Sequence, residues 1–190
     1  GVDRLKKVDS GSLFLVKGGK ALKVSALQNG ARGAVLIAAG VLLPVAFHAA
    51  GASGSIFLPM HIPVLLAGLL CGPMTGALVG ILTPICSTLL TGMPPLFPNL
   101  PLMIPELAVY GGVAGWLHPG KGLLIALIGA MLAGRLAAGM MVGLLAQFVE
   151  FPWTPLVYLG AMVAKGIPGL IIQLLFIPLS VKRLEGWMHR

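Results

Sequence analysis

Charged side chains are scarce in this chain, and acidic ones are the scarcest. Only 9% of its 190 residues are charged, with 5 Asp and Glu against 13 Lys and Arg, whereas a soluble domain carries about 25% charged residues. The chain is 57% hydrophobic and its mean hydropathy is +0.99, so a soluble fold of this length has too little polar surface to cover it. The composition excludes an ordinary soluble domain and predicts an all-α integral membrane bundle.

Cysteines and catalytic motifs are also sparse. Cys71 and Cys86 are the only cysteines, and neither has a His or an acid at ligand spacing, which indicates small buried apolar residues rather than a metal site. A pairing of His48 with His61 is a weak metal candidate. The sequence has no serine-histidine-acid order, no paired acidic motif and no glycine-rich phosphate loop. We therefore expect no catalysis by this chain, no cofactor and no resident metal.

The net charge of +8 is concentrated at the two ends of the chain. Seven of the 13 Lys and Arg lie in residues 1–32, and three more lie at positions 182, 183 and 190. Basic ends that flank an apolar body are typical of a topology signal and suit an anionic membrane surface, not nucleic acid. We interpret residues 1–30 as a basic cytoplasmic tail, in which residues 12–16 form a short strand or one helical turn, and residues 31–186 as the membrane domain.

Six apolar segments predict six transmembrane helices, at about residues 32–47, 58–70, 77–90, 102–117, 122–148 and 155–181. The second and third have about 14 residues each, or roughly 21 Å of helix, which is short against a bilayer core of about 30 Å. The first, third and fifth connections contain no Lys or Arg, whereas the fourth holds Lys121. The positive-inside rule then places both termini in the cytoplasm. Six spans agree with this, because an even number of spans puts both termini on the same side of the membrane.

Two further patterns concern helix contacts and the outer loops. Small residues recur at four-residue spacing, which favours close helix packing in lipid; the pairs are Ala34/Ala38, Gly76/Gly80, Gly111/Gly115 and Gly139/Gly143. The outer loop of residues 91–101 is apolar and rich in proline. Such a loop forms either a lid that folds over a pocket from outside or an ordinary re-entrant turn.

Three lone charges lie inside apolar segments: Glu106, Arg135 and Lys165. An ionisable group at membrane depth normally faces a protein interior or a wet cavity. In one interpretation Glu106 pairs with Arg135 or Lys165 and locks the bundle. In the other, which we favour, two cations against one acid leave positive charge for a carboxylate or phosphate of a solute. In that case we expect Arg135 to anchor the anion.

Neighbouring side chains complete the predicted site. Tyr110 shares a helix face with Glu106 at a spacing of four residues, and Tyr158, Met162 and Lys165 form one stripe on the last helix. Aromatic and Met side chains suit the apolar part of a solute. The predicted substrate-binding residues are Glu106, Tyr110, Arg135, Tyr158, Met162, Lys165, Asn99 and His61, although a lone His is more often structural.

At this point the sequence resembles a known family. Residues 57–73 read Phe-Leu-Pro-Met-His-Ile-Pro-Val-Leu-Leu-Ala-Gly-Leu-Leu-Cys-Gly-Pro, residues 90–95 read Leu-Thr-Gly-Met-Pro-Pro, and residues 105–115 read Pro-Glu-Leu-Ala-Val-Tyr-Gly-Gly-Val-Ala-Gly. Together with Ala34-x-x-x-Ala38, these segments look like the substrate-binding S component of an energy-coupling factor (ECF) transporter. The likeness covers about residues 31–186.

The resemblance implies a bacterial cell-membrane protein that captures a vitamin or related micronutrient between helices four to six, beneath the first and third outer loops. It also implies partners: a transmembrane coupling subunit that contacts Ala34 and Ala38, and two ATPase subunits that hydrolyse ATP. We therefore expect a substrate-binding subunit of an ATP-driven importer for a small anionic or zwitterionic solute. The alternative is an independent secondary transporter or channel, although we find no inverted repeat between the two halves.

Overall fold

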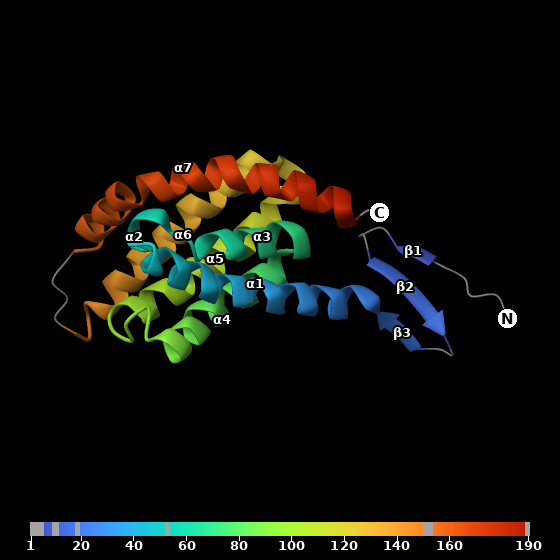
Figure 1. Cartoon of the computed structure of the whole chain (residues 1–190), viewed down its shortest axis with the longest axis horizontal. Coiled ribbons are helices and arrows are strands. Elements are labelled where there is room, and N and C mark those ends of the chain that lie inside the picture. The colour runs from blue at the N-terminus through green and yellow to red at the C-terminus, as the bar shows by residue number, and fades with distance from the viewer. Residues whose placement is uncertain (1–5, 9–11, 18–19, 52–53, 150–153, 189–190) are drawn as a thin grey trace.

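The computed structural model describes residues 6–8, 12–17, 20–51, 54–149 and 154–188. Its membrane part is a bundle of helices (Figure 1), which in chain order are α1 (Val24–Ala49), α2 (Gly54–Phe57), α3 (His61–Cys71), α4 (Pro73–Thr91), α5 (Asn99–Lys121), α6 (Leu123–Leu145) and α7 (Pro155–Met188). Five of these helices (α1, α4, α5, α6 and α7) are long and apolar enough to cross a membrane, and α3 is a shorter apolar helix. This confirms the predicted all-α membrane bundle, with five full-length spans and one short one.

The described part of the basic N-terminal stretch forms a small sheet. Three antiparallel strands follow one another in the order β1 (Lys6–Val8), β2 (Ser12–Lys17) and β3 (Lys20–Lys23). Of the two structures expected for residues 12–16, the strand is therefore the one observed, and α1 begins at Val24, earlier than predicted. The sheet and the end of α7 lie at the same end of the molecule (Figure 1), as an even number of crossings requires.

Helix α3 is short because glycine and proline stop it. Gly72 has a φ of +90°, a conformation that favours glycine, and Pro73 then occupies the first turn of α4, where a missing N–H costs little. The 11 residues of α3 span only about 16 Å. Ten of them are buried, and a helix that is apolar on all sides belongs in a core. Helix α3 is thus the central element around which the longer helices pack.

Glycines bring α3, α4 and α5 into backbone contact. A β-carbon at Gly111 on α5 would overlap the backbone of Gly76 on α4, and one at Gly80 would overlap the backbone of Leu107. Gly115 and Gly68 meet in the same way between α5 and α3. Without a hydrophobic drive between helices in lipid, such close approach is a main source of stability. Of the predicted glycine pairs, Gly76/Gly80 and Gly111/Gly115 therefore form this seam, whereas Gly139 and Gly143 lie against α7.

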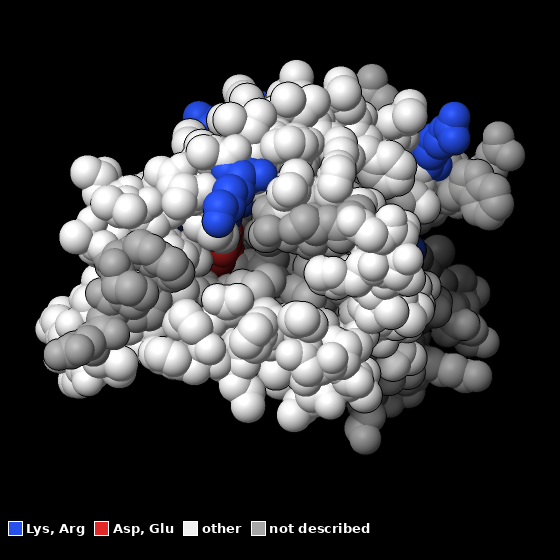
Figure 2. Space-filling view, turned by 60° about the vertical axis from the view of Figure 1, so that its left-hand side comes forward, with Lys and Arg blue, Asp and Glu red and all other residues white. Residues whose placement is uncertain are grey.

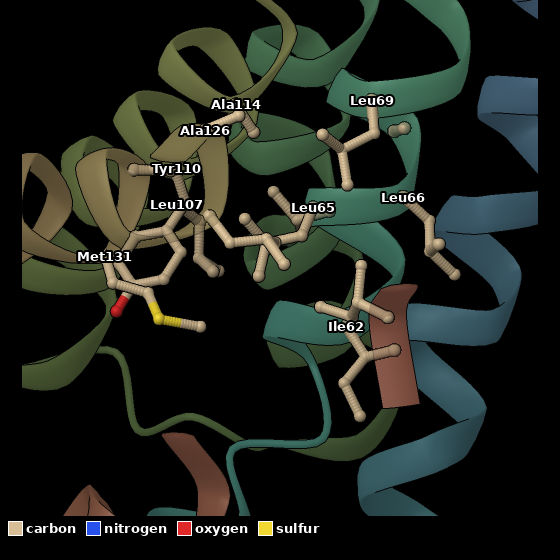
Figure 3. Packing of buried hydrophobic residues seen from close by; sticks show 14 of the residues in the cluster. Ile62, Leu65, Leu66, Leu69, Leu107, Tyr110, Ala114, Ala126 and Met131 are labelled. Atoms are coloured by element: carbon tan, nitrogen blue, oxygen red, sulfur yellow. The ribbon is translucent and has the colours of Figure 1, made fainter. Parts of the chain in front are cut away.

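Apolar side chains fill the space on both sides of α3. Figure 3 shows Leu65 of α3 and Leu107 of α5 directed toward one another, and both are fully buried. Tyr110 is also fully buried in this cluster, and Met131 joins it from α6. In contrast, large apolar side chains on the outer faces of α6 and α7 are exposed, among them Leu132. These outer faces suit lipid, so the described helices form a multi-pass membrane protein.

Candidate functional site

A cavity of about 380 Å³ opens toward the end of the bundle where α1 ends and α7 begins. Figure 2 shows a hollow with a basic side chain beside it and an acidic side chain deep behind its opening. The cavity wall is formed by the end of α1, the segment leading into α3, the loop after α4, the start of α5 and the first half of α7. Its volume lies at the lower end of the range typical of small-molecule sites, which is about 300–1,000 Å³.

The wall of this cavity is apolar, adaptable and positively charged. Four methionines and four prolines contribute to it: Met60, Met93, Met103, Met162, Pro44, Pro59, Pro94 and Pro95. Thioether side chains adjust to irregular shapes and make favourable contacts with aromatic rings. Lys165 is the charged side chain of the wall, and among the residues that the structure describes no Asp or Glu lines the cavity. The surface therefore suits a solute with an apolar or aromatic body and a negative charge.

Behind the floor of the cavity lies an ion pair. Arg135 Nη1 on α6 donates a hydrogen bond to Glu106 Oε1 on α5 over 2.6 Å, and both residues are buried, with exposures of 6% and 0%. His61 Nε2 lies 3.5 Å from the same Glu106 oxygen, and the imidazole meets the Tyr110 ring edge to face. Because His61 also lines the cavity, it connects the wall to the ion pair. The structure thus pairs Glu106 with Arg135 and leaves Lys165 at the cavity.

Several polar atoms beside this pair have no hydrogen-bond partner of good geometry among the described residues. They are His61 Nδ1, Glu106 Oε2, the Tyr110 hydroxyl, and Nε and Nη2 of Arg135. The Tyr110 hydroxyl and Arg135 interact electrostatically and through a side-chain hydrogen bond, although the geometry of this bond is not close to ideal. Buried polar groups in proteins are nearly always paired, and an unpaired one costs about 1–3 kcal/mol. The floor therefore has unused donors and an unused acceptor.

Side-chain hydrogen bonds hold the loop after α4 against that helix. Ser87 Oγ donates to the carbonyl oxygen of Met93 over 2.6 Å, and Thr88 Oγ1 donates to that of Pro94 over 2.8 Å. Both accepting residues line the cavity. The loop expected to be a lid or a re-entrant turn is therefore a tethered part of the wall in this structure.

The opposite wall is fixed to α7. Gly169 leaves room for the backbone of Phe57, because a β-carbon there would lie 2.8 Å from its carbonyl oxygen. Gln173 Nε2 donates a hydrogen bond of 3.5 Å to the carbonyl oxygen of Leu58, whose φ of 51° is uncommon for a residue with a side chain. Leu58 lines the cavity, so α7 determines the position of the segment that leads into α3.

The predicted site residues separate into two groups. Five line the cavity, namely His61, Asn99, Tyr158, Met162 and Lys165. Three lie behind its floor, namely Glu106, Tyr110 and Arg135. The structure thus brings all eight around one cavity and its floor, with Asn99 at the start of α5. The binding role of each residue stays a prediction.

Sequence reasoning missed part of the wall. Met103 belongs to a stripe on α5 with Asn99, Glu106 and Tyr110. Met103, Glu106 and Tyr110 lie 4, 7 and 11 residues after Asn99, and this helical periodicity was the signal for Met103. Met93 and Pro94 lie in the loop after α4, where no periodicity exists. The predicted outer connection of residues 149–154 lies largely outside the described residues.

The paired alanines of α1 lie on the surface. Ala34 and Ala38 are both exposed, and Ala34 borders a second groove, which is formed by α1, the turn between α3 and α4, and the start of α4. Asn29 donates a hydrogen bond to the carbonyl oxygen of Cys71 across this groove over 3.2 Å. The groove is therefore at the end of α1 opposite to the cavity, which α1 reaches through Pro44 and His48.

A multi-pass membrane bundle with a solute-sized cavity among its helices defines a membrane protein that binds a small molecule. Residues 30–181 match the family model described as "ECF transporter, substrate-specific component". Since this match covers most of the chain, the protein belongs to that family, and it is a substrate-binding subunit of a transporter. No curated protein and no solved structure matches the chain.

Proposed function

We propose that this chain captures a small carboxylate of vitamin-like size in the cavity and presents it to an ATP-driven importer in the bacterial cell membrane. The observation that carries the proposal is Lys165, a cation in a largely apolar wall to which no described acid contributes. Lys165 is itself exposed at the cavity, where its ammonium would pair with a carboxylate through charge-assisted hydrogen bonds. Arg135 is already neutralised by Glu106, so we assign the anion to Lys165.

The remaining wall residues supply the fit to the solute body. Met162 and Tyr158 lie on α7 one and two turns before Lys165, and Asn99 faces the cavity from α5. A ligand held at Lys165 would contact thioethers and an aromatic ring along its length, while the Asn99 amide offers two N–H donors and a carbonyl acceptor. This combination of an apolar body and a few polar contacts is typical of small-molecule sites.

Transport would depend on partner proteins. We propose that the exposed face of α1 at Ala34 and Ala38 docks on the transmembrane coupling subunit, and that two ATPase subunits hydrolyse the ATP. Support comes from the exposure of both alanines and from the groove beside Ala34, since small residues allow close helix approach in lipid. Both termini would then face the cytoplasm, as the charge distribution predicts.

A ligand screen tests this function. The purified chain in detergent is heated with a panel of carboxylate vitamins and with the corresponding uncharged amides. A ligand that binds only the folded state adds about 2.7 kcal/mol of stability at 100 times its Kd, so at least one carboxylate should raise the melting temperature saturably. No stabilisation by any carboxylate at millimolar concentration would contradict the proposal. Uptake into liposomes by this chain alone would contradict its dependence on ATPases.

A further inference from the structure

Resting on the proposed function, we infer that His48 is a second anion-binding residue of the cavity, so that the preferred solute is a dicarboxylate with one carboxylate at Lys165 and the other at His48. His48 lies in the last turn of α1 and lines the cavity. No described Asp or Glu in the wall competes for it. The imidazole would therefore distinguish a dicarboxylate from a monocarboxylate of the same shape.

Both basic side chains lie at the accessible part of the cavity. His48 and Lys165 are exposed, and the end of α1 and the beginning of α7 lie at the same end of the molecule (Figure 1). Pro44, one turn before His48, also lines the cavity but is buried, so this face of α1 runs from the interior to the opening. A sphere with the volume of this cavity is about 9 Å across, and a vitamin-sized molecule with a carboxylate at each end spans a similar distance.

The imidazole of His48 is accessible to a solute and has no other role in the described part of the chain. Its side chain makes no hydrogen bond or ion pair with a described residue. His61, the other histidine of the wall, lies 3.5 Å from Glu106 and belongs to the buried network. The two histidines do not complete a metal site, because the described residues contain no group of three His, Cys, Asp or Glu side chains that could hold an ion. His48 is therefore the histidine of the wall that a solute reaches.

The charge of an imidazole depends on pH, and this gives the inference a distinctive signature. Histidine changes its charge between about pH 5 and 8, whereas carboxylates and lysine ammonium groups stay charged over most of this range. A dicarboxylate should therefore bind more tightly at about pH 6 than at about pH 8, and a monocarboxylate held at Lys165 should not. His61 and Tyr158 are the other titratable side chains of the described wall, and a His48 variant separates their effects from that of His48.

The experiment measures equilibrium binding of two matched pairs of probes: nicotinate with pyridine-2,5-dicarboxylate, and hexanoate with adipate. Each pair differs by one carboxylate. The proteins are the unmodified chain, His48→Gln and Lys165→Met. His118→Gln is the matched control, because His118 lies in the last turn of α5, whereas α5 reaches the cavity at its first residue, Asn99. His48 is exposed, so its replacement should leave the melting temperature nearly unchanged.

We expect the dicarboxylate of at least one pair to bind about threefold to fivefold more tightly at about pH 6 than at about pH 8, the effect of one exposed ion pair. His48→Gln should remove this difference, and His118→Gln should retain it. A dicarboxylate that binds no more tightly than its monocarboxylate partner, or a pH dependence that persists in His48→Gln, would overturn the inference. If Lys165→Met weakens both members of a pair and His48→Gln weakens neither, the proposed function stands and the second anion site is wrong. If none of the four probes binds, both fail.

Discussion

The contact between Gly111 on α5 and Gly76 on α4 leads to a sharp prediction for Gly111→Ala. A β-carbon at this position meets the backbone of Gly76, and backbone cannot move aside as a flexible side chain can. Overpacking costs about 1–3 kcal/mol, and a backbone obstacle belongs at the upper end of that range. Because α4 and α5 pack against one another along an extensive seam, the two helices have to adjust together to the extra methyl group.

Gly112→Ala is the control. Its β-carbon would meet Ala77 Cβ at 3.7 Å and the carbonyl oxygen of Pro73 at 3.9 Å, both ordinary contacts. The substitution gains the same helix propensity of about 1 kcal/mol. At about 2–4 °C per kcal/mol for a chain of this length, we expect Gly111→Ala to melt roughly 5–10 °C below Gly112→Ala. Thermal unfolding in detergent, followed by near-ultraviolet circular dichroism, gives the comparison. Equal melting temperatures would refute the backbone contact.

Three further predictions concern the ion pair, the tethered loop and the α1 surface. Arg135→Met should lower the free energy of unfolding by about 3–5 kcal/mol, because it leaves Glu106 buried and unpaired. In chemical unfolding, the Glu106→Met/Arg135→Met double variant should recover most of this lost stability. A double variant as unstable as Arg135→Met would contradict the prediction. Thr88→Val, which removes the hydrogen bond to the loop, should weaken ligand binding about threefold to tenfold in calorimetry, and an unchanged affinity would show that the tether does not shape the wall. Ala34→Trp should abolish co-purification with the coupling subunit while Val35→Trp, on the neighbouring face, retains it; equal recovery would place the docking surface elsewhere.

Much of the fold follows from the sequence because lipid imposes a simple rule on it. Long apolar segments must be helices, and the predicted sixth segment of residues 155–181 corresponds to α7, which continues to Met188 through Pro168 and Pro178. The helix ends are less predictable, since they depend on backbone conformation, as at Gly72. The sequence predicts that α3 is short. Its central position in the bundle cannot be predicted without knowing which helices pack around it.

The site can be predicted from the sequence where isolated charged residues mark it. Glu106, Arg135 and Lys165 are conspicuous in apolar segments, but the choice of partner for Glu106 depends on the packing of α5, α6 and α7. Only that packing leaves Lys165 at the cavity and Arg135 behind it.

The central claim is that Lys165 receives the carboxylate of a solute in this cavity. The most direct measurement is the ratio of affinities for a bound carboxylate and its neutral carboxamide, by calorimetry, in the unmodified chain, Lys165→Arg and Lys165→Met. We predict a preference for the carboxylate of about tenfold in the first two and nearly none in Lys165→Met. The same preference in Lys165→Met as in the unmodified chain would contradict the account.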